Sequence, residues 1–207
     1  NYEKIKSPVN KLYRADIIDR NGIFLSKTIS SIDIGISPQK IIDDKRLMLN
    51  LKYIFPNKDY EKIESKLNNK KFFWLEKKIS DENYEKIMKL GDKSIQPEEK
   101  LTRIYPESNL FSHIIGQIDN DNNGISGLEK KLDDVLKKSK KPIKLTVDKD
   151  IQFLIRNELV RFNEIFDTKG SAAILMDVNH GEILSLVSLP DFDPNKREKI
   201  FDTNFIN

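Results

Sequence analysis

The chain has 207 residues, enough for one large domain or two small ones, and 38% of them are hydrophobic, which is sufficient for a packed core. Lys and Arg (36) nearly balance Asp and Glu (33), so the net charge of +3 is too small to indicate a nucleic-acid-binding protein. There is no cysteine, which excludes disulfides, thiolate nucleophiles and zinc sites built on Cys. No segment of this sequence approaches the roughly 18 consecutive apolar residues of a membrane-spanning helix, and none has the pattern of a signal peptide.

Short strands and turns are predicted near the start. Residues 1–13 are polar and irregular and are interpreted as a linker. The sequence Asp19-Arg20-Asn21-Gly22 predicts a tight turn between two short apolar strands, because Asn and Gly tolerate positive φ. Alternating isoleucines at 32, 34 and 36 predict a further strand, which ends at Ser37-Pro38.

Two helices are predicted next. Apolar residues spaced three and four apart share one face of a helix over 58–67. Ser80 is a suitable N-cap for the following helix, and Gly91 stands where a C-terminal cap belongs. Between the two helices lies an aromatic run at 72–75, which we interpret as a buried anchor, with a partner surface as the alternative.

Helical periodicity continues in the second half of the chain. It predicts a helix over 108–115 that stops at Gly116, and another over 125–137. The lysine-rich segment 137–142 then breaks the periodicity and is the best candidate for a domain boundary. We interpret its lysines as a solvated linker, with attraction to an anionic lipid or polymer as the alternative.

The last part of the chain carries the clearest pattern. Asp148 is placed to cap the longest predicted helix, over about 149–166. Two nearly continuous apolar runs, 172–176 and 183–187, flank Asn179-His180-Gly181 and predict a β-hairpin with two faces that need cover. The rest of the chain is too short to supply that cover, so we expect the chain to be cut within a domain.

The segment from Asp119 to Gly124 has the spacing of oxygen ligands and glycine that begins a calcium-binding loop. The bidentate Glu of such a loop stands at position twelve, where this chain has Lys130, and Glu129 comes one residue early. One residue turns a side chain by about 100° around a helix. A polar turn leading into a helix is therefore the preferred interpretation, with a Ca²⁺ site as the alternative, and we expect no metal and no cofactor.

Several segments, in chain order, resemble class B penicillin-binding proteins. Gly170 to Pro194, with Gly181-Glu182-Ile183-Leu184 and Ser188-Leu189-Pro190, resembles the opening hairpin of their transpeptidase domain, and Leu145-Thr146-Val147-Asp148 with Ile151-Gln152 resembles the strand and helix that enter it. Upstream segments resemble the pedestal of these proteins: Asp19-Arg20-Asn21-Gly22, Arg103-Ile104-Tyr105-Pro106, Gly116, Asp121 and Gly124-Ile125-Ser126-Gly127-Leu128-Glu129.

The resemblance implies an α+β fold, with a non-catalytic pedestal (dimerisation-type) domain over 1–141 and the N-terminal portion of a penicillin-binding transpeptidase domain over 142–207. The implied parent is a serine-type D,D-transpeptidase, closer to the division-type members, that cross-links peptidoglycan and is blocked when a β-lactam acylates its serine. Family members carry a membrane anchor just before such a sequence, so we expect trimming at both ends and a parent on the extracytoplasmic (periplasmic) face of the bacterial inner membrane. The expected partners are the membrane glycan polymerase and other cell-wall synthesis or division proteins.

Penicillin-binding catalysis needs Ser-x-x-Lys, Ser-x-Asn and Lys-Thr/Ser-Gly. Only Ser37-Pro38-Gln39-Lys40 matches the first motif, and neither of the others occurs. So short a pattern often matches by chance, and this one ends a strand in the pedestal-like half. The resemblance places the nucleophile beyond Asn207. We therefore reject Ser37, assign no catalytic residue and expect the chain to be inactive alone.

The remaining candidate residues are expected to be structural or to contact partners. Arg103 and Glu129 are the charged residues of two pedestal motifs, and we expect them to form a partly buried ion pair, with a binding role as the alternative. Arg14-Ala15 stands where the family usually shows Arg-Gly, which puts close packing of the first strand in question. The full set is Asp19, Arg20, Gly22, Arg103, Tyr105, Pro106, Gly116, Gly124, Gly127 and Glu129. The alternative function is a free-standing interaction module, with or without Ca²⁺ dependence.

Overall fold

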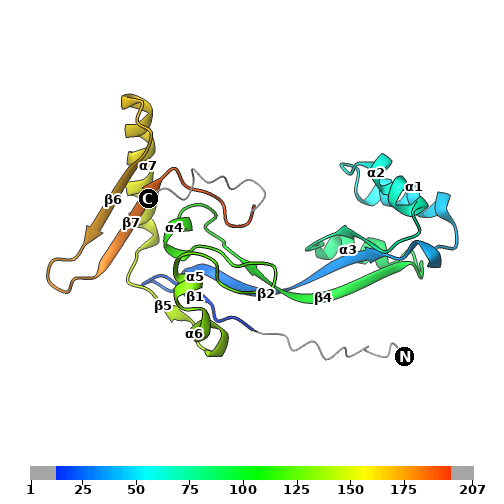
Figure 1. Cartoon of the computed structure of the whole chain (residues 1–207), viewed down its shortest axis with the longest axis horizontal. Helices are drawn as coiled ribbons and strands as arrows, with labels where there is room; N and C mark the ends of the chain where they lie inside the picture. Colours follow the sequence, from blue (N-terminus) through cyan, green and yellow to red (C-terminus); the bar gives the residue numbers. More distant parts are fainter. Residues whose placement is uncertain (1–12, 197–207) are drawn as a thin grey trace. The chain divides into compact units, whose positions relative to one another are not determined.

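The computed structural model describes residues 13–196, and the chain has a mixed α+β fold. Among the described residues, 13–29 and 103–196 form one compact unit, which we call the terminal unit, and Ser30–Thr102 form a second, the central unit. The chain passes from the terminal unit to the central unit within strand β2 (Phe24–Ile36) and returns within strand β4 (Ile95–Ile104). Figure 1 shows the path of the chain, coloured along the sequence.

The central unit combines the end of β2 with three helices. β2 pairs with β4 and, antiparallel, with β3 (Phe73–Glu76), so that Ile34 lies opposite Glu76. The helical elements are a 3-10 turn, η1 (Pro38–Lys40), and the helices α1 (Asp44–Ile54), α2 (Tyr60–Asn68) and α3 (Asp81–Met88). The predicted strand at 32–36 and the helices near 58–67 and after Ser80 are confirmed.

Each helix of the central unit begins at a side-chain cap. Asp43, Asp59 and Ser80 each accept a hydrogen bond from a backbone N–H in the first turn that follows. The helices then bury one apolar face against the strands. The resulting core consists of Ile34, Ile36, Leu47, Leu51, Ile54, Phe55, Ile63, Leu75, Ile79, Ile87 and Ile95.

The terminal unit begins with a small mixed sheet. β1 (Ile17–Ile18) pairs antiparallel with β2 and parallel with β5 (Ile143–Lys144). Three short helices follow in the chain: α4 (Ser112–Ile115), α5 (Gly127–Lys131) and α6 (Asp133–Lys138). Ala15 is fully buried, and its N–H donates to the Leu136 carbonyl at 2.8 Å, so the first strand packs closely although it has Ala where the family usually has Gly.

A long helix and a hairpin complete the terminal unit, as predicted. The carboxylate of Asp148 caps α7 (Lys149–Phe166), and β6 (Ser171–Met176) pairs antiparallel with β7 (Ile183–Leu189). The hairpin is only partly covered by the described residues, because Ile174 and Met176 are 66% and 53% exposed.

Three predictions about local structure need correction. The helix expected over 108–115 is confined to α4, because Ser108 has a φ of +49°, which a right-handed helix does not accommodate. The helix expected over 125–137 is divided into α5 and α6 at Leu132, beside the carboxylate of Asp133 that accepts hydrogen bonds from elsewhere in the unit. The aromatic run is not wholly buried: alternation along β3 leaves Phe72 and Trp74 47% and 38% exposed.

Candidate functional site

A buried carboxylate lies between two arginines in the terminal unit. Glu129 Oε2 accepts from Arg14 Nε at 2.5 Å, and Glu129 Oε1 accepts from Arg103 Nε at 2.8 Å and from Ser26 Oγ at 2.7 Å. The side chains of Glu129, Arg14 and Arg103 are all 1% exposed or less. We call Arg14, Arg103 and Glu129 the ionic cluster; it joins three segments that are far apart in the sequence.

Asp133 extends this cluster toward solvent. Its carboxylate accepts hydrogen bonds from Arg14 Nη1 at 2.6 Å, from Lys137 Nζ at 2.7 Å and from the backbone N–H of Gly124 at 2.8 Å. Burial alone would raise the pKa of Asp133, but the hydrogen bonds from Lys137, Gly124 and Arg14 outweigh burial and lower this pKa to about 2. The charged form of Asp133 is therefore part of the folded structure at neutral pH.

Three of the predicted glycines lie where the backbone approaches itself. A Cβ at Gly116 would come within 2.1 Å of the Ser126 carbonyl oxygen, and one at Gly124 would come within 2.0 Å of the Glu129 carbonyl oxygen. Gly127 has a φ of +55°, and a Cβ at this position would come within 2.6 Å of the backbone of residues 115 and 116. A side chain at any of these three positions would collide with the backbone, so they require glycine, and their absence of a side chain lets the segments around Glu129 pack closely.

The predicted turn at 19–22 lies against the start of α7. Asp19 is fully buried; its Oδ1 accepts from the N–H groups of residues 21 and 23, and its Oδ2 accepts from the N–H of Lys149 at 3.2 Å. Asn21 Nδ2 donates to Asp148 Oδ2 at 3.0 Å, and Arg20 lies 3.6 Å from the Glu182 carboxylate in an exposed pair. Gly22 supplies the positive φ of the turn, +89°. The turn therefore contacts both α7 and the hairpin.

Gln152, on α7, makes the most complete set of contacts between the hairpin and the rest of the terminal unit. It is 1% exposed; its Nε2 donates to the carbonyls of Leu110 and Leu186 at 3.0 and 2.8 Å. Its Oε1 accepts from Ser185 Oγ at 2.7 Å and from the Leu186 N–H at 3.0 Å. The amide thus pairs with the edge of β7 as a neighbouring strand would, and it also binds the turns that precede α4.

The segment that leaves β7 is bound by residues 105–113, which comprise these turns and the first two residues of α4; we call them the 105–113 loop. Asp191 accepts from Asn109 Nδ2 at 3.0 Å and from Arg156 Nε at 2.6 Å. The side chain of Asn195 exchanges two hydrogen bonds with the backbone of Tyr105, at 3.0 and 2.9 Å. These contacts join α7, the 105–113 loop and the end of the hairpin.

Ring contacts add to this junction. His113 Nε2 lies 2.9 Å from the Pro190 carbonyl oxygen, and its ring packs edge-on against Phe192 with centroids 5.4 Å apart. Tyr105 is 5% exposed, and burial raises the pKa of its hydroxyl, whereas Pro106 is exposed. The junction therefore combines apolar packing with hydrogen bonds.

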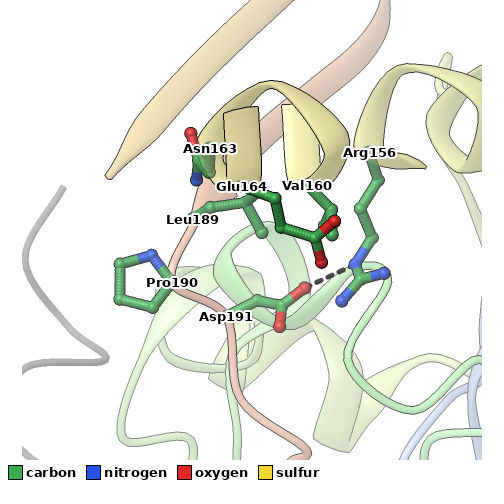
Figure 2. Close-up of a pocket in the computed structure, with 7 residues that line it drawn as sticks. All are labelled: Arg156, Val160, Asn163, Glu164, Leu189, Pro190 and Asp191. Carbon is green, nitrogen blue, oxygen red and sulfur yellow. Dashed lines mark hydrogen bonds and ion pairs between the residues drawn. The ribbon is translucent and has the colours of Figure 1, made fainter. Parts of the chain in front are cut away.

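An open pocket of about 350 Å³ lies beside the junction, between α7 and the end of β7. Figure 2 shows its seven lining residues: the Arg156–Asp191 ion pair on one side, Leu189 and Pro190 on the other, with Val160, Asn163 and Glu164 along the helix. None of these side chains is a hydroxyl, thiol or amine nucleophile. The ionisable groups of the pocket are the Arg156 guanidinium and the carboxylates of Glu164 and Asp191.

A protein-family model described as "Penicillin-binding Protein dimerisation domain" matches residues 10–163 of this chain. The chain belongs to this family. The match to this penicillin-binding protein domain includes the ionic cluster, the three close-packed glycines and Gln152. The family resemblance stated from the sequence is confirmed, as is the α+β pedestal fold.

Curated relatives extend the match beyond residue 163. The chain is 27% identical over 198 residues to "Probable peptidoglycan D,D-transpeptidase FtsI" of Caulobacter vibrioides, covering 94% of this chain and 34% of the relative. It is 29% identical over 211 residues to "Stage V sporulation protein D" of Bacillus subtilis, covering 87% and 33%. It is 28% identical over 246 residues to "Peptidoglycan D,D-transpeptidase FtsI" of Buchnera aphidicola, covering 99% and 41%. The chain thus spans about a third of the length of the first two of these relatives.

A solved structure supports the fold. A peptidoglycan synthetase from Bifidobacterium adolescentis superposes with a TM-score of 0.53 at 19% identity, covering 88% of this chain and 43% of that one. At this identity the likeness is one of fold. Within residues 13–196, no helix is both long enough and apolar enough to cross a membrane.

The structure also describes the two motifs that the sequence analysis set aside, the Ser-x-x-Lys match at Ser37 and the calcium-like segment from Asp119 to Gly124. Ser37 follows the last residue of β2, its N–H donates to the Ser94 carbonyl at 2.9 Å, and Lys40 closes the 3-10 turn that begins at Pro38. In the calcium-like segment, Asp119 Oδ1 accepts from the N–H groups of residues 121 and 123, at 2.8 Å each, and so closes its own turn. The described residues include no cluster of three or more His, Asp or Glu side chains suited to a metal ion.

Sequence reasoning identified part of this arrangement. It named Arg103 and Glu129, which the structure brings together, and Tyr105, which lies in the junction. It did not name Arg14 as a partner of Glu129. The two residues are 115 positions apart in the sequence, yet their side chains are in direct contact. The family pattern around Arg14 was the one signal that could have indicated its role.

Proposed function

We propose that this chain is the non-catalytic scaffold region of a peptidoglycan cross-linking transpeptidase that acts in cell-wall synthesis and cell division. Membership of the penicillin-binding dimerisation-domain family supports this proposal, as do relatives whose names describe peptidoglycan D,D-transpeptidases. The scaffold positions the catalytic domain and contacts partner proteins, with the membrane glycan polymerase as the leading partner.

In this proposal residues 1–141 are the pedestal, and residues 142–207 begin the transpeptidase domain. The catalytic serine belongs to a part of the protein outside this chain, which has neither the Ser-x-Asn nor the Lys-Thr/Ser-Gly motif. The site of action is the extracytoplasmic face of the bacterial inner membrane, where peptidoglycan is cross-linked. The residues proposed for structural or partner contacts remain those of the pedestal motifs, together with Arg14.

The observation that carries the proposal is the junction between the 105–113 loop and the hairpin. Gln152 binds Leu110 and Leu186 at once, and Asp191 binds both Asn109 and Arg156. Because these bonds fix the edge and the end of β7, a displacement of the loop also displaces the hairpin. A transpeptidase domain that contains this hairpin would therefore take its position from the pedestal.

Gln152→Leu in the full-length transpeptidase tests this positioning role. Leucine is similar in volume but makes none of the four hydrogen bonds, so the hairpin loses its attachment to the 105–113 loop. We expect the second-order rate constant for acylation by a fluorescent penicillin to fall roughly 10- to 100-fold, because a small misplacement of catalytic groups costs that much. Glu158→Gln, an exposed change on the same helix, is the matched control.

Circular dichroism and thermal unfolding establish whether the Gln152→Leu protein is folded before acylation is compared. The proposal predicts a folded variant that acylates slowly beside a control that acylates at the original rate. A folded Gln152→Leu protein with an unchanged acylation rate would show that the junction does not position the catalytic domain.

A further inference from the structure

Helix α1 in the central unit has apolar residues on two faces. Leu47, Leu51 and Ile54 are spaced four and three apart and are buried in the core. On the other side, Leu49 and Tyr53 are 70% and 81% exposed. A helix at a protein surface ordinarily presents polar residues to solvent, so two large apolar residues one turn apart form a patch rather than isolated exceptions.

A groove adjoins this patch. It lies between α1 and α2, which are neighbours in the chain and run along the same part of the central unit (Figure 1), and its volume is about 520 Å³. Its apolar lining consists of Pro38, Met48, Leu49 and Leu67. Leu49 thus belongs both to the exposed patch and to the groove, and the two form one continuous surface.

The edges of the groove carry more cations than anions. Lys45, Lys52 and Lys70 line it, against Asp44 and Glu64. Among the described residues, no ion pair involves Lys45 or Lys70, and Lys52 Nζ lies 5.6 Å from the centroid of the Tyr60 ring. The lysines at 45 and 52 are seven residues apart, so they lie on one face of α1, on either side of Leu49.

We propose that this groove docks an amphipathic helix of a partner protein, with an apolar stripe flanked by Asp or Glu. The groove between two helices admits a third helix, which buries apolar residues on Met48, Leu49 and Leu67. Lys45 and Lys52 are about 10 Å apart along the axis of α1, a distance that two turns of a partner helix span. Carboxylates two turns apart on the partner therefore reach both lysines. The proposal concerns the central unit alone and does not depend on the transpeptidase function.

The probe is a synthetic amphipathic peptide of about 15 residues, long enough for a marginal helix, with a leucine stripe flanked by glutamates. A second peptide has lysine in place of every glutamate. Because the chain has no cysteine, Asn68→Cys in the exposed lining of the groove accepts a single environment-sensitive fluorophore. We expect saturable binding of the acidic peptide, weakened by added salt, and at least about tenfold weaker binding of the basic peptide.

Substitutions on α1 show whether binding uses the groove. Leu49→Asp should weaken binding of the acidic peptide at least about tenfold, because it removes a buried leucine from the interface. Replacing both Lys45 and Lys52 with Glu should reverse the preference between the two peptides. Lys62→Glu on the exposed side of α2 and Val178→Asp in the hairpin make matched changes outside the groove and should leave binding unchanged.

Three results would overturn the proposal. The first is equal binding of the acidic and basic peptides, or binding of the acidic peptide that Leu49→Asp does not weaken. The second is no peptide binding together with dimerisation in sedimentation equilibrium that Leu49→Asp abolishes, which would make the occupant a second copy of the chain. The third is no peptide binding together with Leu49-dependent binding to phosphatidylglycerol vesicles, which would make the occupant a lipid surface.

Discussion

Removing the carboxylate of Glu129 tests the ionic cluster most severely. In Glu129→Ala, Arg14 and Arg103 lose the acceptor on which both guanidinium groups converge, at 2.5 and 2.8 Å; both side chains are 1% exposed in the original chain. Leaving a buried charge without its partner costs about 3–5 kcal/mol. Arg103 is then left with only the Asp16 carboxylate, at 4.0 Å, whereas Arg14 keeps its pair with Asp133 at 2.6 Å. Set against a typical domain stability of about 5–15 kcal/mol, this loss leaves the terminal unit marginal or unfolded.

Urea unfolding followed by circular dichroism measures this cost. With a slope of about 2 kcal/mol per molar urea, a loss of about 4 kcal/mol lowers the midpoint by about 2 M. Glu129→Gln keeps the volume and one acceptor oxygen and should fall between the original chain and Glu129→Ala. Glu82→Gln, in the exposed pair with Lys86, is the control and should leave the midpoint unchanged. A Glu129→Ala midpoint within about 0.3 M of the original would show that the cluster does not stabilise the fold.

Two further predictions concern the surroundings of this cluster. The pKa of Asp133 is lowered from 3.8 to about 2 in the folded chain, so its contribution to stability is complete above pH 3.8 and is lost as pH falls toward 2. In Asp133→Asn the free energy of unfolding should therefore fall less steeply between pH 3.8 and pH 2 than in the original chain. Equal slopes for the two proteins would contradict this prediction. Gly127→Ala combines a φ of +55° with backbone contacts at 2.6 Å and should lower the thermal midpoint more than Gly22→Ala, where nothing lies within 4 Å of an added Cβ. Equal losses in the two variants would show that the close approach at Gly127 relaxes.

The elements that the sequence predicted correctly are those with local signals. The cap at Asp148, the length of α7 and the β6–β7 hairpin follow from neighbouring residues, and the structure has all three. Local signals failed where contacts from distant segments decide the backbone. Asp133, for example, accepts hydrogen bonds from Arg14 and Gly124, and the helix expected through it is divided just before it.

The aromatic run at 72–75 shows a different limit. Its composition predicted burial, but a strand directs alternate side chains to opposite faces, and only one face of β3 meets the core. Leu75 is buried on that face, whereas Phe72 lies over Gly35, where a Cβ would come within 2.3 Å of its ring. The interpretation as a wholly buried anchor did not consider this alternation.

The junction could be predicted only in part. Tyr105 and the segment ending at Pro194 were recognised by family resemblance, but nothing in the sequence joined them. Their contact depends on Asn195 meeting Tyr105, 90 residues away, and on Gln152 meeting Leu110, 42 residues away. Polar pairs at such separations leave no periodic pattern, so they become visible only in the folded chain.

Incubating the purified chain with a fluorescent penicillin tests most directly whether it is a non-catalytic scaffold. An acyl-enzyme needs an activated serine and donors that stabilise the oxyanion, and the one Ser-x-x-Lys sequence here lies in a 3-10 turn at the end of β2. The account predicts no covalent label on a denaturing gel, for the original chain and for Ser37→Ala alike. Stoichiometric labelling that disappears in Ser37→Ala would contradict it and make Ser37 a nucleophile.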